Sequence, residues 1–169
     1  MASLIRQNYH EDCEAVVNKN INLHLHASYV YLSMASHFDR HDVSLPGLRK
    51  FFKESSAREK EQAEKLMQYQ SKRGGRVAFQ AVQAPPKRDW GTALEALQSA
   101  LEMERLLNQA FLDILKEAED KGDPHLDEFI EEEFLEGKVE VIEKLGHMTT
   151  QLKRAGPAGL GEYLFDKDQ

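Results

Sequence analysis

The sequence is poor in residues that interrupt helices or cross-link a chain. Its 169 residues include one cysteine, five prolines and ten glycines. A lone cysteine, Cys13, excludes a disulfide within the chain and fits a reducing compartment. Because helix breakers are scarce and Leu, Glu, Ala and Lys are frequent, the composition favours long helices. The length predicts a single domain, residues 1–169, with a sizeable core.

The absence of excess positive charge and of long apolar segments excludes two classes of partner. The chain has no excess of positive charge, since its formal net charge is −7, so we expect no nucleic-acid partner. No apolar run approaches the roughly eighteen residues of a membrane span. Residues 1–7 also lack the apolar core of a signal peptide. We therefore expect a cytoplasmic protein with no membrane partner.

What the sequence does contain is four long segments of helical composition, separated by helix-ending signals. Pro46 suits the first turn of a helix, and Gly74 can adopt the left-handed conformation that ends one. Thr92 and Asp123 are good N-caps. These signals predict helices at about 10–39, 46–74, 92–121, 124–154 and 159–167, the last of them short.

The long connection between the second and third helices decides the topology. Residues 75–91 can stretch over about 55 Å, which exceeds the roughly 45 Å length of each long helix. The other connections are short and make their neighbouring helices antiparallel. The sequence therefore predicts an all-α four-helix bundle with a long crossover loop and a short fifth C-terminal helix.

Each long helix has an inward stripe at steps of three and four residues, and each stripe carries one ionisable side chain. These side chains are His24, Glu59, Glu104 and Lys138, all at about the same level. One interpretation is a buried ion-pair network of Lys138 with the two carboxylates. The other is a metal site like those of di-iron bundles, although Gln62 stands where the histidine of a Glu-x-x-His motif is expected. The third-helix stripe reads Leu94, Leu97, Leu101, Glu104, Asn108, Phe111 and Leu115.

Several stretches make the sequence resemble the ferritin family over nearly its whole length. They are residues 5–10, 27–34, 73–76, 123–126 and 161–167, which read IRQNYH, ASYVYLSM, RGGR, DPHL and GEYLFDK. The resemblance implies an animal cytosolic ferritin subunit with a heavy-chain-like body. It also implies a homo-oligomeric 24-subunit shell, open to co-assembly with other ferritin subunits. Such a shell takes up ferrous iron and holds ferric mineral.

Heavy-chain ferritins oxidise ferrous iron with dioxygen at a di-iron centre inside each bundle. By resemblance, the catalytic residues kept here are Glu59, Glu104 and Tyr31. His24 replaces a family glutamate and Gln62 replaces the family histidine. The metal ligands implied are therefore His24, Glu59, Glu104 and Gln62.

Two substitutions at the same centre add positive charge. Arg58 replaces a family glutamate and Lys138 replaces a glutamine, and both cations disfavour iron. We expect an impaired ferroxidase centre, as in the family's light chains. The alternative is an active ferroxidase rewired through His24, at a site that could also take other divalent metals.

The resemblance also assigns surface sites. The residues implied for a threefold entry channel are His125, Asp127, Glu128 and Glu131. Those implied for mineral nucleation are Glu54, Glu61 and Glu64, and those for a fourfold channel are Leu164 and Asp168. From the pattern alone, the acidic channel segment is equally a first helical turn that suits the helix dipole. The nucleation residues alone would be an ordinary charged face.

Overall fold

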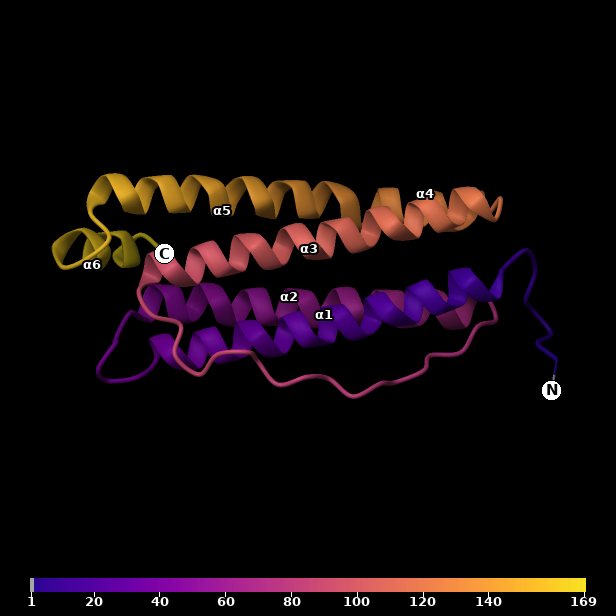
Figure 1. The fold of residues 1–169 in the computed structure, drawn as a ribbon, viewed down its shortest axis with the longest axis horizontal. Coiled ribbons are helices and arrows are strands. Elements are labelled where there is room, and N and C mark those ends of the chain that lie inside the picture. Colours follow the sequence, from indigo (N-terminus) through magenta and orange to yellow (C-terminus); the bar gives the residue numbers. More distant parts are fainter. Residues whose placement is uncertain (1) are drawn as a thin grey trace.

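The computed structural model describes residues 2–169, and the regular structure within this range is entirely helical, as predicted. Four long helices lie side by side, with a short helix across one end of the bundle (Figure 1). The elements are α1 (Glu11–Phe38), α2 (Pro46–Lys72), α3 (Ala93–Asp120), α4 (Pro124–Ile130), η1 (Glu131–Leu135), α5 (Glu136–Ala155) and α6 (Leu160–Lys167). None of these helices is long and apolar enough to cross a membrane.

The helix ends follow the local signals. Pro46 occupies the first turn of α2, and Gly74, just after its end, has a φ of 82°. Thr92 caps α3 through a capping box with Glu95, in which each side chain bonds to the other residue's backbone N–H. The Asp123 side chain caps α4. These caps satisfy donors that would otherwise lack partners at the helix starts.

The fourth helix differs from the prediction, which was one uninterrupted helix over 124–154. The structure inserts the π-helical segment η1 between α4 and α5. A π-helical turn holds more residues than an α-helical turn, so it changes the facing of every side chain that follows, including Lys138. A search for 3.6-residue periodicity cannot detect such an insertion.

The buried face of α3 is wider than the predicted stripe. Leu97, Glu104 and Phe111 are fully buried as expected. The other four stripe residues are only half-buried: Leu94, Leu101, Asn108 and Leu115. The remaining buried positions are Ala93, Ala96, Ala100, Leu107, Ala110, Ile114 and Ala118. This shift arises because α3 packs against both α1 and α5, so its inward face covers more than one stripe.

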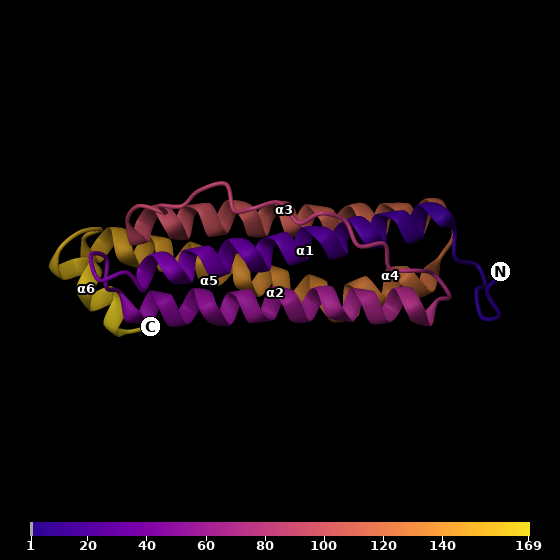
Figure 2. The ribbon, with the colours of Figure 1, turned by 90° about the horizontal axis from the view of Figure 1, so that it is seen from below.

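The crossover loop is bound along α1 by side chains spaced four residues apart. Figure 2 shows the loop passing obliquely over α1 towards the start of α3. The α1 residues that contact it are Asn18, Asn22 and His26, which share one helix face. Their amide and imidazole N–H groups donate to backbone carbonyls of Arg76 at 3.0 Å, Ala81 at 3.2 Å and Gln83 at 3.0 Å. These contacts hold an otherwise irregular segment in place, and no sequence signal marked them.

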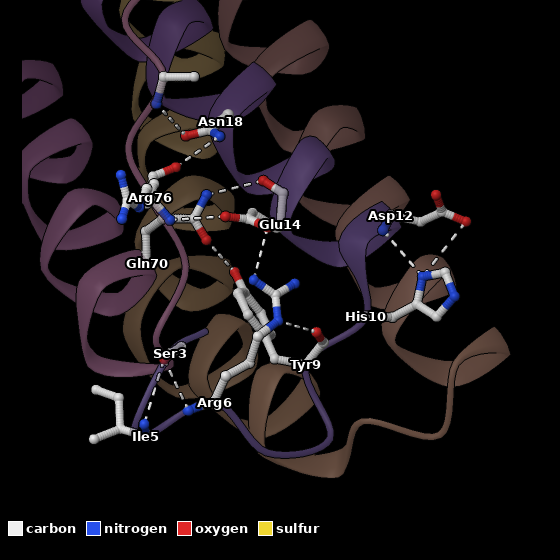
Figure 3. Close-up of polar contacts among 11 residues, drawn as sticks. Ser3, Ile5, Arg6, Tyr9, His10, Asp12, Glu14, Asn18, Gln70 and Arg76 are labelled. Atoms are coloured by element: carbon white, nitrogen blue, oxygen red, sulfur yellow. Dashed lines mark hydrogen bonds and ion pairs between the residues drawn. The ribbon is translucent and has the colours of Figure 1, made fainter. Parts of the chain in front are cut away.

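Glu14 fixes the start of the same loop (Figure 3). Its carboxylate accepts from the backbone N–H of Arg76 at 2.7 Å and from the Arg6 guanidinium at 2.8 Å. Its backbone carbonyl accepts from the Gln70 side chain at 2.9 Å. Although partial burial acts in the opposite direction, the hydrogen bonds from Arg76 and Arg6 to the carboxylate lower the pKa of Glu14. One residue thus joins the N-terminal segment, the end of α2 and the crossover loop.

Helix α6 is attached to the bundle through two carboxylates. Asp166 accepts from the backbone N–H groups of Gly47 at 3.1 Å and Leu48 at 2.7 Å. The N-cap residue of α2 makes no capping bond of its own, so Asp166 supplies it. Glu162 accepts from the backbone N–H of Ala93, at the start of α3, at 3.1 Å. Both carboxylates therefore lie where helix dipoles favour negative charge.

The hydrophobic core forms two clusters along the bundle. One includes Tyr31, Phe52 and Leu97, and the other includes Ile21 and Phe111. The ionisable residues of the four stripes belong to neither cluster. The fold therefore leaves a polar layer in the middle of the bundle, where the candidate site lies.

We predict that Gly47→Ala loosens α6. A Cβ at position 47 would lie 2.0 Å from the backbone oxygen of Asp166, so α6 must move and its capping bonds weaken. We expect the free energy of unfolding to fall by about 1–3 kcal/mol in urea titrations. Gly146→Ala is the control, since its added Cβ would meet no other part of the protein within 4 Å beyond its own stretch of helix. It should gain roughly 0.5–1 kcal/mol. Equal changes in the two variants would contradict the packing described.

Candidate functional site

Four side chains, one from each long helical segment, meet in the polar layer. His24 comes from α1, Glu59 from α2, Glu104 from α3 and Lys138 from α5, and each residue has 0% of its surface exposed. The prediction that they reach the same level is confirmed by their contacts. Buried charges need partners, so the arrangement of donors and acceptors decides what this site can do.

Lys138 bridges the two carboxylates. Its Nζ donates to Glu59 Oε1 and to Glu104 Oε2, both at 2.8 Å. Tyr31 donates its hydroxyl hydrogen to the other Glu104 oxygen at 2.6 Å, and an Arg58 guanidinium nitrogen lies 3.6 Å from that oxygen. Burial would raise the pKa of Glu104, but Lys138 and the hydrogen bonds outweigh it and hold that pKa below its usual value. Glu104 is therefore the anionic partner of the ammonium.

Glu59 has a poorer set of partners. Its Oε2 makes no hydrogen bond, and Lys138 is shared with the second carboxylate. Burial and repulsion from Glu104 raise the pKa of Glu59 to about 8, against the attraction of Lys138. Glu59 is therefore the carboxyl group of the pair that holds a proton more readily, and Glu104 is the better stabilised anion.

His24 is neutral and presents a lone pair to the site. Its Nδ1–H donates to the Asn20 carbonyl at 2.8 Å, so Nε2 carries the lone pair. This Nε2 has no hydrogen-bond partner and lies 3.8 Å from Glu59 Oε2. Burial, with the nearby Lys138, lowers the pKa of His24 to about 3. The ring also packs on Phe111, with centroids 4.7 Å apart.

The site is unusual in its number of buried polar atoms without hydrogen bonds. Besides His24 Nε2 and Glu59 Oε2, they include Gln62 Oε1 and Asn108 Oδ1. Such atoms are rare in protein interiors and often accompany a functional site. Sequence reasoning included Gln62 but gave no role to Asn20, which orients His24, or to Asn108. The spacing of Asn20 four residues before His24 was the only available signal.

The arrangement favours an ion pair over a pair of metal ions. Among residues 2–169, no group of three or more His, Cys, Asp or Glu side chains is arranged to hold a metal ion. The Lys138 ammonium contacts both of the carboxyl groups that the sequence predicts as metal ligands. It supplies the positive charge that metals provide in di-iron bundles.

The expected channel residues lie at the opposite end of the bundle from α6. His125 and Glu128 are exposed on α4, Asp127 is half-buried, and Glu131 begins η1. The Tyr69 hydroxyl and His125 Nδ1 share a hydrogen bond of 2.8 Å. Repulsion by the nearby Asp127 carboxylate raises the pKa of Glu131.

The remaining predicted residues are on the surface of the chain. Glu54, Glu61 and Glu64 are exposed along α2, and Leu164 and Asp168 are exposed at α6. They remain available to contacts outside the chain.

The architecture and central carboxylates define the class: a four-helix protein of the ferritin-like kind. The Ferritin family, described as a ferritin-like domain, matches residues 14–155. A ferritin from Pacifastacus leniusculus is 56% identical over 168 residues, covering 99% of this chain and 92% of its own. The ferritin middle subunit of Aquarana catesbeiana is 54% identical, covering 99% and 96%. The soma ferritin of Lymnaea stagnalis is 52% identical, covering 98% and 95%. The chain belongs to the ferritin family.

The site makes stability depend on pH in a defined direction. The pKa of Glu59 is about 8 in the folded chain and near 4.5 in the unfolded chain. Between these pH values the folded state therefore holds one more proton than the unfolded state. The free energy of unfolding therefore falls as pH rises through this window. The pKa of His24 is lowered from 6.5 to about 3, so between these values the unfolded chain holds the extra proton. His24 therefore makes the free energy of unfolding rise with pH up to about 6.5. We expect the clearest fall from about pH 6.5 to 8 in urea titrations.

Glu59→Gln should remove this fall, because the amide stays neutral throughout. Glu54→Gln is the matched control, since it changes an exposed carboxylate on the same helix and should keep the parent slope. An unchanged slope in Glu59→Gln would place the titrating group elsewhere.

Proposed function

We propose that this chain is an iron-storage ferritin subunit whose ferroxidase centre is closed by Lys138. It forms a 24-subunit cytoplasmic shell, alone or with other ferritin subunits, and the shell takes up ferrous iron and holds ferric mineral. The observation that carries the proposal is the 2.8 Å bridge from Lys138 to both Glu59 and Glu104. Membership of the ferritin family supports the storage role.

The bridge opposes iron binding in two ways. A ferrous ion between the carboxylates would lie within a few ångströms of the ammonium, where like-charge repulsion in a buried site is strong. The ammonium also cannot leave easily, because Lys138 is 0% exposed and would have to break both of its charge-assisted hydrogen bonds. Arg58 adds a second cation close to Glu104. Oxidation would then occur at the growing mineral or in active partner subunits.

The surface carboxylates provide the rest of the storage function in this proposal. Iron enters past the acidic group of α4 and η1, since rings of carboxylates attract and pass divalent cations. The exposed carboxylates of Glu54, Glu61 and Glu64 on α2 then seed the mineral. At the other end, α6 lines a fourfold axis with Leu164 and Asp168.

Stopped-flow mixing tests the closed centre directly. Iron-free protein is mixed with ferrous iron under air, at about two ions per subunit, and early ferric absorbance is followed. The control is a restored variant carrying Lys138→Gln, Gln62→His, His24→Glu and Arg58→Glu. We expect the parent to be slower by at least about a hundredfold, roughly 2.7 kcal/mol of activation free energy. Equal rates would overturn the proposal and establish a working site built from His24, Glu59 and Glu104.

A second candidate function is a single-cation site on the side of Glu59 away from Lys138. The observation that favours it is the set of buried acceptors without hydrogen bonds: His24 Nε2, Glu59 Oε2 and Gln62 Oε1. One imidazole nitrogen with carboxylate and amide oxygens suits a borderline divalent cation such as Zn²⁺. A cation there would displace the Glu59 proton while leaving Lys138 paired with Glu104.

Calorimetric titration with Zn²⁺ on iron-free protein tests this second site. The site predicts one buried zinc per chain, lost in His24→Leu, which removes the imidazole and keeps the apolar contact with Phe111. His147→Ala is the matched control, because that side chain is 71% exposed and distant from the bundle interior. If His24→Leu binds zinc as the parent does, the single-cation site is wrong, whatever the oxidation rates show.

A further inference from the structure

His37 is a second buried histidine, and it lies near the end of α1, away from the polar layer. Only 3% of its surface is exposed, and its ring packs edge-on against Phe38 with the ring centroids 4.9 Å apart. Its hydrogen bonds run to the crossover loop instead of to the central site.

Both ring nitrogens of His37 bind the backbone of the loop where it joins α3. The Gly91 carbonyl lies 2.9 Å from Nε2, and because a carbonyl can only accept, Nε2 carries the ring hydrogen. The backbone N–H of Trp90 donates to Nδ1 at 3.4 Å, so Nδ1 carries a lone pair. The junction therefore selects the neutral imidazole and one of its two tautomers.

The Trp90 side chain holds the same junction to α1. Its indole N–H donates to Ser33 Oγ at 3.0 Å, and Ser33 lies one turn before His37 on the helix. Trp90 is 4% exposed and belongs to one of the two hydrophobic clusters. Two α1 residues thus fasten the loop just before Thr92, the N-cap of α3.

Protonation of His37 would remove one of these contacts. Nδ1 would become a donor facing the backbone N–H of Trp90, and neither group could accept from the other. A buried backbone N–H without an acceptor is costly, so the Trp90 backbone and the imidazolium would move apart. The bond from Nε2 to the Gly91 carbonyl would survive, because that nitrogen donates in both charge states.

Asp89 offers the protonated ring another partner. Its Oδ1 lies 3.8 Å from His37 Nδ1 and accepts from the backbone N–H of Gly91 at 2.8 Å. Of the acids in residues 2–169, only Asp89 lies within 4 Å of a His37 ring nitrogen. Its side chain is 71% exposed and therefore has room to move towards the ring. The junction thus holds a partner for each charge state of His37, which is the requirement for a two-state element.

Charged side chains on the neighbouring elements leave Asp89 as the acid that can exchange partners. Arg40 lies 3.8 Å from Asp89 Oδ2 but binds Asp42 more closely, at 2.6 Å. Lys87 and Glu102 line a groove together with Trp90 and bring opposite charges to it. The other acids near the junction have partners of their own: Asp39 with Arg49 of α2, Glu95 with the backbone N–H of Thr92, and Glu162 of α6 with that of Ala93.

We propose that His37 is a pH-sensitive latch on the crossover loop. The neutral imidazole holds Trp90 and Gly91 against α1. The imidazolium binds Asp89 and releases the Trp90 backbone, which loosens the end of the loop and the start of α3. The latch does not involve the iron chemistry proposed for the central site, so the failure of either proposal leaves the other intact.

Trp90 reports on the latch, because it is the only tryptophan in the chain. The purified full-length protein is titrated from about pH 8 to about pH 5, the range in which histidine side chains commonly change charge. Acrylamide quenching of Trp90 fluorescence is followed together with far-UV circular dichroism. We expect quenching to rise through a single transition on acidification, while the helix content stays constant.

Three variants assign the transition to its residues. His37→Gln keeps an N–H donor and a carbonyl acceptor but does not titrate, so the transition should be lost. His41→Gln is the matched control, since it changes an exposed histidine four residues later and should keep the transition. Asp89→Asn keeps His37 but removes the negative charge that pairs with the imidazolium, so the transition should move to lower pH by roughly half a unit.

Several results would overturn the proposal. One is constant quenching of the parent over the whole titration, and another is a transition that persists in His37→Gln. A loss of helix that accompanies the rise in quenching would assign the change to general acid unfolding. If His37→Gln does not fold, Asp89→Asn still decides the matter, because an unchanged transition in that variant contradicts the exchange of partners.

Discussion

The ammonium group of Lys138 is the interaction on which the middle of this bundle depends. It lies between carboxylates from α2 and α3, and so joins the two antiparallel helix pairs at their centre. Without it, Glu59 would lose its hydrogen-bond donor and the buried Glu104 carboxylate would keep only the more distant Arg58 as a cationic partner, at a cost of several kcal/mol. The two hydrophobic clusters stabilise the ends of the bundle but leave this layer to electrostatics. The chain therefore supplies from its own sequence the cation that balances these buried carboxyl groups.

Much of the fold could be predicted because its signals are local. The caps at Thr92 and Asp123 and the proline at Pro46 act within a few residues, so the helix ends follow from short stretches of sequence. The polar layer was predictable for a related reason. Helices rise by a constant amount per residue, so the equal depth of His24 and Lys138 in their helices transfers directly to equal height in the bundle.

The features that sequence reasoning missed all depend on partners distant in the chain or on backbone detail. Asp166 caps α2 through Gly47, which lies 119 residues earlier in the chain, and no periodicity links the two positions. The η1 insertion changes the facing of residues without altering their composition. The orientation of His24 depends on the Asn20 carbonyl, and backbone acceptors are invisible in a pattern of side chains. Local rules thus identified which residues meet, while tertiary contacts decided how they meet.

The row of Asn18, Asn22 and His26 has a consequence for how this surface can change over time. These side chains bind the crossover loop through its backbone atoms, using carbonyls along the loop and the N–H of Ala78. The loop's own side chains take no part in those bonds. The side chains on its outer surface can therefore change one by one while its path stays the same. The exceptions are prolines at position 76 or 78, which would delete the N–H groups that donate to Glu14 and Asn18. Helix α1 therefore fixes the path of the loop, while the side chains on the loop's outer surface can change during evolution.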